Sequence, residues 1–321
     1  MLRLIGRVIA MTAALWASAA SAQPYPTRPI HLLVSYPPGG AADIVARAVG
    51  APLAARLGQP VVVENRPGSN GNLAGELVAA ANPDGQTLLL GPSALFGINP
   101  HLYAKMAIDP LKDLLPVASV VSNALLLAAN PKLEPRSFRD FIAFARRAPS
   151  PLFYASIGNG SEHHLAMEML KQAAGINLTH VPYKGGGPAA LGVMGGDVAV
   201  MFGGGSASAL VQSGELRGLA ISSRARSGVL PDIPAIAEFY PDYEVTLWQG
   251  LFAPVGTRAE VVVRLRNELY AVLAQPDLIG KLAAAGSGDP YVTTQAEFAA
   301  RIRADDAKYG KVIKDIGLKL E

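Results

Sequence analysis

The sequence predicts an α/β protein of two lobes, each with a mostly parallel sheet flanked by helices. Short apolar runs alternate with helix-period segments along the chain, an order typical of parallel sheets with right-handed crossovers. The chain has 321 residues, half of them hydrophobic, which is enough to bury the cores of two ordinary domains. A glycine-rich junction between a strand and a helix occurs twice, at Ser35 to Asp43 and at Ser156 to His164.

Residues 1–22 have the order of a secretory signal peptide. Two arginines precede an apolar run from Val8 through Trp16, and the small residues Ala20, Ser21 and Ala22 follow. The apolar run is too short to span a bilayer comfortably. We therefore expect cleavage after Ala22, export, and a soluble mature chain that begins at Gln23.

The composition excludes several classes of function. The chain has no cysteine, which excludes a disulfide framework, a thiol nucleophile and a thiolate metal site. The formal charge of +3 includes two arginines of the signal peptide, so the mature chain carries +1 and is a poor candidate for nucleic-acid binding. The sequence lacks the Gly-x-x-x-x-Gly-Lys-Ser/Thr phosphate-binding pattern, and we expect neither a nucleotide nor another cofactor.

The first lobe is expected to begin with three apolar strands separated by helices. Gly58 follows the first helical pattern as a C′ residue, and Pro52 is expected to kink that helix or to limit its regular part. The carboxyl ends of parallel strands share one edge of a sheet, so the loops at Pro37 to Asp43 and Gly91 to Ala94 are expected to face the same cleft. The expected strands are Ile30 to Val34, Val61 to Glu64 and Thr87 to Leu90, and the expected helices are Ala42 to Leu57 and Leu73 to Ala81.

The chain is expected to cross between the lobes twice, through the apolar extended runs Val117 to Ala129 and Tyr243 to Ala253. We assign residues 23–123 and 250–321 to the first lobe and residues 124–249 to the second. Ser137 is expected to cap the first helix of the second lobe, and Gly175 to end the next one. The remaining expected elements are the strands Phe153 to Ser156, Val198 to Phe202 and Leu216 to Ser222 and the helix Ala259 to Ala274.

The two glycine-rich junctions are candidate anion-binding sites. The first amides of a helix lack partners within the helix, and the aligned peptide dipoles place partial positive charge there. One such junction in each lobe would form a clamp for a small molecule with acidic ends. Tyr183 and Lys184 add a phenol and an ammonium group nearby. The alternative is that each junction is only a tight turn, capped by Asp43 or by Ser161.

Six motifs in a fixed order resemble the Bug or TctC family, the periplasmic solute-binding proteins of tripartite tricarboxylate transporters. The resemblance covers nearly the whole mature chain. In chain order the motifs are Arg28-Pro29-Ile30 with Tyr36-Pro37-Pro38-Gly39-Gly40 and Asp43, Glu64-Asn65-Arg66-Pro67-Gly68, Pro83-Asp84-Gly85, Val181-Pro182-Tyr183-Lys184-Gly185, Leu230-Pro231-Asp232-Ile233-Pro234 and Ala253-Pro254-Val255-Gly256-Thr257.

The resemblance implies a type II periplasmic-binding-protein fold with a ligand cleft between the lobes. It also implies a monomer that works in the periplasm without catalysis, captures a small organic carboxylate and delivers it to the membrane components of a transporter. The junctions and the resemblance together predict these ligand-binding residues: Tyr36, Pro38, Gly39, Gly40, Ala41, Asp43, Gly91, Ser93, Ser156, Gly158, Asn159, Gly160, Ser161, His164, Tyr183, Lys184, Phe202 and Gly203.

The resemblance also bears on the class of ligand. Family members that bind amino acids often carry an aspartate in or just after the strand predicted here at Val198 to Phe202. This chain has Ala199 and Gly203 at the matching positions. We therefore expect a ligand without an amino group, either a di- or tricarboxylate or an aromatic carboxylate.

Two other functions remain open. A ligand-sensing subunit of a signalling system would have the same fold. A secreted serine hydrolase would use Ser161 as nucleophile and His164 as base, although this spacing is also ordinary at a helix start and no Gly-x-Ser-x-Gly elbow is present. His164 and Glu168 lie one turn apart, but the sequence lacks the His-Glu-x-x-His pattern, and we expect no metal. Trp248 is expected in the core or at the hinge.

Overall fold

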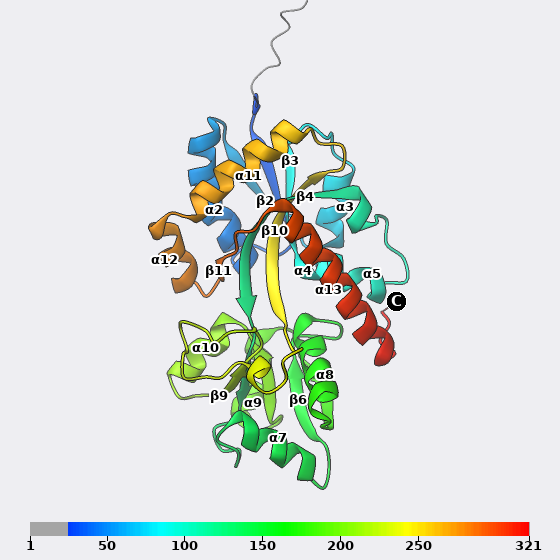
Figure 1. The fold of residues 1–321 in the computed structure, drawn as a ribbon, viewed down its shortest axis with the longest axis vertical. Helices are drawn as coiled ribbons and strands as arrows, with labels where there is room; N and C mark the ends of the chain where they lie inside the picture. Colours follow the sequence, from blue (N-terminus) through cyan, green and yellow to red (C-terminus); the bar gives the residue numbers. More distant parts are fainter. Residues whose placement is uncertain (1–24, 321) are drawn as a thin grey trace, which may run out of the picture.

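The computed structural model describes residues 25–320. Residues 1–24 and 321 lie outside this range, and with them the predicted signal peptide and its cleavage position. The described chain forms two lobes, each built on one sheet (Figure 1). Within residues 25–320 no helix has the length and apolar character needed to cross a membrane.

The first lobe contains a six-stranded sheet in the order β11-β4-β10-β3-β1-β2. One half of the sheet is parallel, because β1 pairs in the same direction with β2 and with β3. The other pairs, β10 with β3, β10 with β4 and β11 with β4, are antiparallel. The strands are β1 (Ile30–Val34), β2 (Val61–Asn65), β3 (Thr87–Pro92), β4 (Leu114–Ala124), β10 (Thr246–Pro254) and β11 (Asp289–Pro290).

Helices cover both faces of this sheet. Alternate strand residues point to opposite faces: Leu32 and Leu90 pack with α2, α11 and α12, whereas Leu33 and Leu89 pack with α3, α4 and α13. The helices are α2 (Ala41–Leu57), η1 (Ser69–Gly71), α3 (Asn72–Ala79), α4 (Ser93–Gly97), α5 (Asn99–Leu102), α6 (Pro110–Asp113), α11 (Ala259–Leu273), α12 (Pro276–Ala284) and α13 (Gln295–Asp315).

The second lobe contains a five-stranded sheet in the order β7-β6-β8-β5-β9. Strand β6 is parallel to β7 and β8, whereas β5 is antiparallel to β8 and β9. Helices α7 and α8 pack on one face, and α9 and α10 on the other. The elements are β5 (Leu126–Ala129), α7 (Phe138–Arg147), β6 (Leu152–Ser156), α8 (Glu162–Ala174), β7 (Leu178–Pro182), α9 (Gly186–Gly195), β8 (Val200–Gly203), α10 (Gly205–Gln212), β9 (Arg217–Ile221) and η2 (Ile236–Glu238).

The predicted two-lobed α/β fold is confirmed, but the sheets are mixed rather than mostly parallel. The strands that enter from the other lobe are β5 and β10, and each pairs antiparallel with its neighbours in the sheet. A strand that enters a sheet from the other lobe does not need the helical crossover that imposes a parallel direction. The apolar run Val117 to Ala129 accordingly contributes to two sheets, with β4 in the first lobe and β5 in the second.

The two passages lie side by side. The chain leaves the first sheet after Ala124 and enters the second at Leu126. On the return, the Val245 amide still bonds Ser222 of the second lobe, while Thr246 already pairs with Ala124. Figure 1 shows β4 and β10 side by side where the first lobe meets the second.

Most of the capping residues that the sequence predicts lie at a helix end. Gly58 ends α2 in the left-handed region with φ 74°, and Ser137 caps α7 by accepting a hydrogen bond from the Asp140 amide. Gly175 ends α8. Pro52 does not limit α2, which continues as one helix on both sides of it. Strand β3 extends to Pro92, so Gly91 is a strand residue rather than part of a loop.

Candidate functional site

The carboxyl ends of β1 and β3 bring two predicted loops of the first lobe to one edge of the sheet. Val34 lies opposite Leu90 in the parallel register. The loop after Val34 and the start of α4 at Ser93 therefore lie next to each other, as the sequence predicts.

The first glycine-rich junction presents an exposed backbone. Gly39 has φ +82°, a conformation that favours glycine, and Gly40 precedes α2 in an extended conformation without a side-chain cap. The residues from Pro38 to Ala41 are exposed. Because no side chain among residues 25–320 caps this helix start, its first amides are free to receive an anion.

Asp43 holds this junction in shape. Its carboxylate accepts a hydrogen bond from the Gly39 amide at 3.0 Å and bonds the Arg47 guanidinium and the Asn65 amide, each at 3.0 Å. The Arg47 guanidinium and then the Gly39 amide lower the pKa of Asp43 to about 2. The carboxylate of Asp43 is thus bonded within the loop, and its role is to hold the loop in this conformation.

The second lobe gathers its predicted residues in the same way. Strands β6, β7 and β8 are parallel, with Ser156 opposite Pro182 and Tyr154 opposite Val200. The loop from Ser156 to Ser161, the residues after β7 and the end of β8 therefore share one edge. Ser161 caps α8, because its Oγ accepts from the His164 amide at 3.3 Å and donates to the Gly158 carbonyl at 2.7 Å.

His164 is a buried support for this loop. Its Nδ1 accepts a hydrogen bond from the Gly160 amide at 3.1 Å, and its ring stacks on His180 with centroids 3.9 Å apart. His180 Nε2 lies 2.6 Å from Ser156 Oγ. Burial lowers the pKa of His164 and, more strongly, that of His180 to about 4. The Ser161 hydroxyl donates to a carbonyl rather than to His164, so the geometry resembles helix capping and not a nucleophile with its base.

The remaining predicted residues of the second lobe lie in different surroundings. Lys184 and Asn159 are exposed. Phe202 is fully buried among the side chains packed under α7 and α8, so only its backbone lies at the edge. A Cβ at Gly192 of α9 would fall 2.4 Å from the Tyr183 hydroxyl, which places that ring against α9. A Cβ at Gly203 would fall 2.4 Å from that of Ala207, which leaves no room there for a larger side chain.

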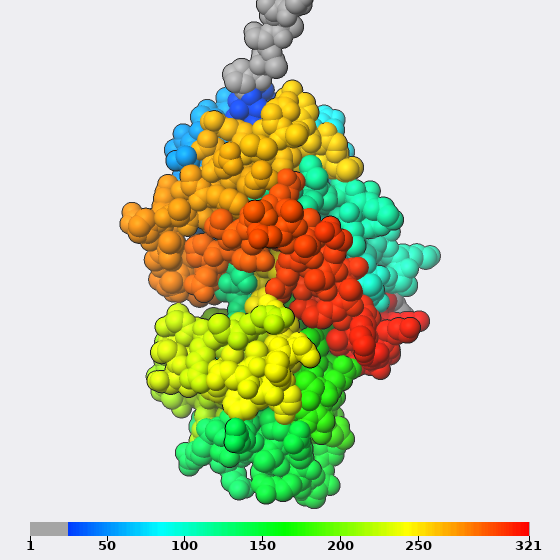
Figure 2. All heavy atoms as spheres, viewed as in Figure 1, coloured from blue at the N-terminus to red at the C-terminus, as the bar shows by residue number. Residues whose placement is uncertain are grey.

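The two edges face each other and are in contact on two sides. On one side, Leu165 of α8 packs with Leu102 and Tyr309 of the first lobe. On the other side, a Cβ at Gly205 would fall 2.6 Å from the carbonyl oxygen of Gly286 in the first lobe. Figure 2 shows a notch in the surface where the orange part of the first lobe meets the yellow-green part of the second.

Glu162 is a residue at this junction that the sequence did not single out. Its carboxylate accepts a hydrogen bond from Ser93 of the first lobe at 2.8 Å, and Ser93 Oγ also accepts from the Trp248 amide at 3.3 Å. Burial raises the pKa of Glu162, as does the negative charge of Asp305, and burial together with Glu162 raises the pKa of Tyr36. An acidic residue directly after an N-cap serine is common, because its charge complements the helix dipole. In the sequence Glu162 therefore looks like an ordinary exposed residue of the first helical turn.

Trp248 lies in the core of the first lobe, as predicted. It is 1% exposed, and its indole nitrogen donates to Asp305 at 2.7 Å. Two cavities, of about 580 and 380 Å³, open elsewhere on the lobes, and none of the predicted ligand-binding residues lines either of them.

Comparisons with known proteins match most of the chain to one family. Residues 45–318 match the family model TctC, described as the tripartite tricarboxylate transporter family receptor. Protein BugT of Bordetella pertussis (strain Tohama I) is 35% identical over 308 residues, which cover 95% of this chain and 94% of the relative.

Two solved structures share both fold and sequence. R. palustris Rpa4515 with adipate is 33% identical with a TM-score of 0.79, and the match covers 92% of this chain and all of that one. MatC (Rpa3494) from Rhodopseudomonas palustris with bound malate is 30% identical with a TM-score of 0.74, and the match covers 90% of this chain and all of that one.

Proposed function

The chain belongs to the receptor family of the tripartite tricarboxylate transporters, and we propose that it captures a small organic acid, a dicarboxylate foremost, between its two lobes. The main support is the pair of glycine-rich helix starts at the facing edges of the two sheets. The uncapped start of α2 can receive one carboxylate through its backbone amides, and the loop from Ser156 to Ser161, whose helix start Ser161 already caps, faces it with the exposed Asn159. Two similar structures contain the dicarboxylates adipate and malate.

Backbone amides can supply the necessary affinity. Hydrogen bonds to a charged group contribute about 1.5–3 kcal/mol each. Three or four of them can carry much of the roughly 8 kcal/mol of micromolar binding after the cost of closing the lobes. A cationic pocket is therefore not required.

The organisation of the whole receptor is part of the proposal. The first lobe comprises residues 23–123 and 250–321 together with Ala124 and Thr246 to Gln249, which lie in its strands β4 and β10, and residues 125–245 form the second lobe. The signal peptide is cleaved behind Ala22 on export to the periplasm. A monomer delivers its ligand to the membrane components of the transporter, and closure of the lobes reports that a ligand is bound. The absence of a carboxylate at Ala199 and Gly203 supports a ligand without an amino group.

The first test is a thermal-shift and calorimetric screen of residues 23–321. The panel contains adipate, malate, citrate, benzoate and aspartate, with adipamide as the uncharged control for adipate. A ligand at about 100 times its Kd adds roughly 2.7 kcal/mol to the free energy of unfolding and shifts the midpoint upward. We expect a dicarboxylate to produce this shift and adipamide to produce none.

Two results would count against the proposal. No shift with any acid, once native mass spectrometry has excluded a co-purified ligand, contradicts carboxylate capture. A shift with aspartate alone contradicts the expected class of ligand. Uptake of the labelled acid by cells with and without this protein separates delivery from sensing, because a sensor changes gene expression without carrying the flux itself.

A further inference from the structure

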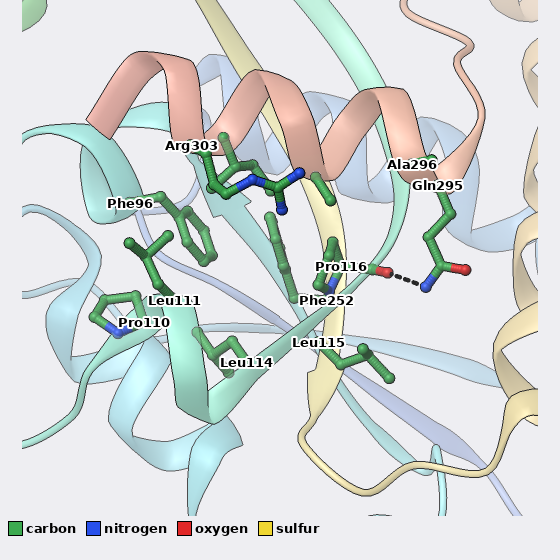
Figure 3. Close-up of a pocket in the computed structure, with 12 residues that line it drawn as sticks. Phe96, Pro110, Leu111, Leu114, Leu115, Pro116, Phe252, Gln295, Ala296 and Arg303 are labelled. Atoms are coloured by element: carbon green, nitrogen blue, oxygen red, sulfur yellow. Dashed lines mark hydrogen bonds between the residues drawn. The ribbon is translucent and has the colours of Figure 1, made fainter. Parts of the chain in front are cut away.

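The larger cavity lies on the first lobe, under the first half of α13 (Figure 3). Its volume is about 580 Å³, within the range of about 300–1,000 Å³ typical of small-molecule sites. The aromatic rings of Phe96 and Phe252 line it and stack on each other with centroids 4.2 Å apart. Leu111 and Leu115 line other parts of the wall. The lining is thus mainly apolar and draws on segments far apart in the chain.

The space exists because α13 has small side chains where it crosses the sheet. Ala296 and Ala299 are three residues apart and lie on one face of the helix. Both line the cavity, and a methyl group is too small to fill it. Gln295 closes one end, with its Nε2 donating to the Pro116 carbonyl at 2.9 Å and its Oε1 accepting from Arg266 at 2.8 Å. These bonds fix that wall.

Arg303 places a positive charge at the cavity. It lies on the same helix face as Ala299, four residues later, and side chains on a helix lean toward its N-terminus. Figure 3 shows the Arg303 side chain running back under α13 above Phe96 and Phe252. Of the groups in residues 25–320, none forms an ion pair or hydrogen bond with this guanidinium, whereas Arg301 of the same helix is paired with Asp305 and Glu244.

We propose that this cavity is a second ligand site, for an amphipathic monocarboxylic acid with an aromatic or medium-chain body. The apolar body would lie against Phe96 and Phe252, and the carboxylate would pair with Arg303. A dicarboxylate suits the site poorly, because its second charge would be buried against apolar walls without a partner. The cavity shares no residue with the predicted site between the lobes.

The test uses 2-naphthoate as the probe, with 2-naphthamide as its uncharged match, measured by calorimetry on residues 23–321. Adipate is added in excess to occupy the site between the lobes. We expect 2-naphthoate to bind under these conditions, Arg303→Gln to weaken it about three- to fivefold, and 2-naphthamide to be insensitive to that substitution. Arg147→Gln, an exposed arginine of the second lobe, is the matched control and should change nothing.

Filling the cavity tests the body of the ligand. Ala299→Leu should abolish binding of both probes, and Ala296→Leu is a second filling variant should the first unfold. Ala300→Leu, on the exposed face of α13, should leave binding intact. Binding that survives both filling variants, or that Arg303→Gln and Arg147→Gln weaken equally, overturns the proposal. Neither result bears on the proposed dicarboxylate site between the lobes, which is tested separately by the response to adipate.

Discussion

At the scale of single residues, Glu162 is the most unusual group at the junction of the lobes. It is 7% exposed, and its carboxylate bonds Ser93 of the other lobe. Asp43 is also buried, but Arg47 compensates its charge. Burial disfavours the ionised form of Glu162 and outweighs the hydrogen bond from Ser93, which favours it, and the charge of Asp305 raises the pKa further.

We predict that Glu162→Gln removes a stability loss that occurs as the pH rises. The raised pKa means that the folded chain holds the proton to a higher pH than the unfolded chain does. The free energy of unfolding is therefore greatest below the unfolded pKa and falls as the pH passes through the folded one. Urea unfolding at pH 4, 5.5, 7 and 8 should show the variant gaining on the native protein toward pH 8.

The control for this prediction is Glu134→Gln. Glu134 is exposed, so its substitution should not change how stability varies with pH. If the free energy of unfolding varied with pH equally in the native chain and in Glu162→Gln, ionisation of the Glu162 carboxylate would not destabilise the fold, and the prediction would be wrong.

At the scale of elements, the starts of the helices decide how closely the lobes approach. Helix α10 begins at Gly205, where a Cβ would fall 2.6 Å from the carbonyl oxygen and 2.8 Å from the Cα of Gly286. Both obstacles are backbone atoms, which cannot rotate away. The lack of a side chain at Gly205 thus permits this approach of the two lobes.

We predict that Gly205→Ala weakens binding of the ligand between the lobes about tenfold. The clash arises only when the lobes touch, and overpacking typically costs about 1–3 kcal/mol. Calorimetry should show the loss of affinity, and small-angle scattering with saturating ligand should show a larger radius of gyration than that of the native complex.

Gly280→Ala is the matched control for this change. Gly280 lies inside α12, and a Cβ there meets no atom within 4 Å. Its substitution should leave affinity unchanged. Unaltered affinity in Gly205→Ala would indicate that ligand binding does not require this contact.

At the scale of the whole molecule, buried histidines make the fold sensitive to acid. Burial lowers the pKa of His163 to about 4, and His180 behaves in the same way. Both are neutral in the folded chain, whereas an unfolded histidine titrates near 6.5. Their contribution to stability is complete above about pH 6.5 and is lost as the pH falls toward 4.

We predict that acidification from pH 7 to pH 5 lowers the free energy of unfolding by roughly 2 kcal/mol through His163 alone. In His163→Gln the free energy of unfolding should vary less between pH 7 and pH 5, whatever its absolute value. Urea unfolding at several pH values in this range measures that dependence. A slope that His163→Gln does not alter would contradict the prediction.

The sequence by itself determined those features that depend on neighbours along the chain. The strand and helix order, the caps at Ser137 and Ser161 and the two glycine-rich junctions all follow from local signals. Backbone conformations and helix ends are set by residues within a few positions of one another. The ordered motifs that carry the family resemblance are local in the same sense.

Only the tertiary structure decided which distant residues meet. The bond between Ser93 and Glu162, the approach of Gly205 to Gly286 and the cavity between Phe252 and Ala299 join positions far apart in the chain. The mixed direction of the sheets has the same origin, because it depends on how the chain passes between the lobes. Such contacts leave no periodic pattern in the sequence, since each partner alone looks like an ordinary core, capping or surface residue.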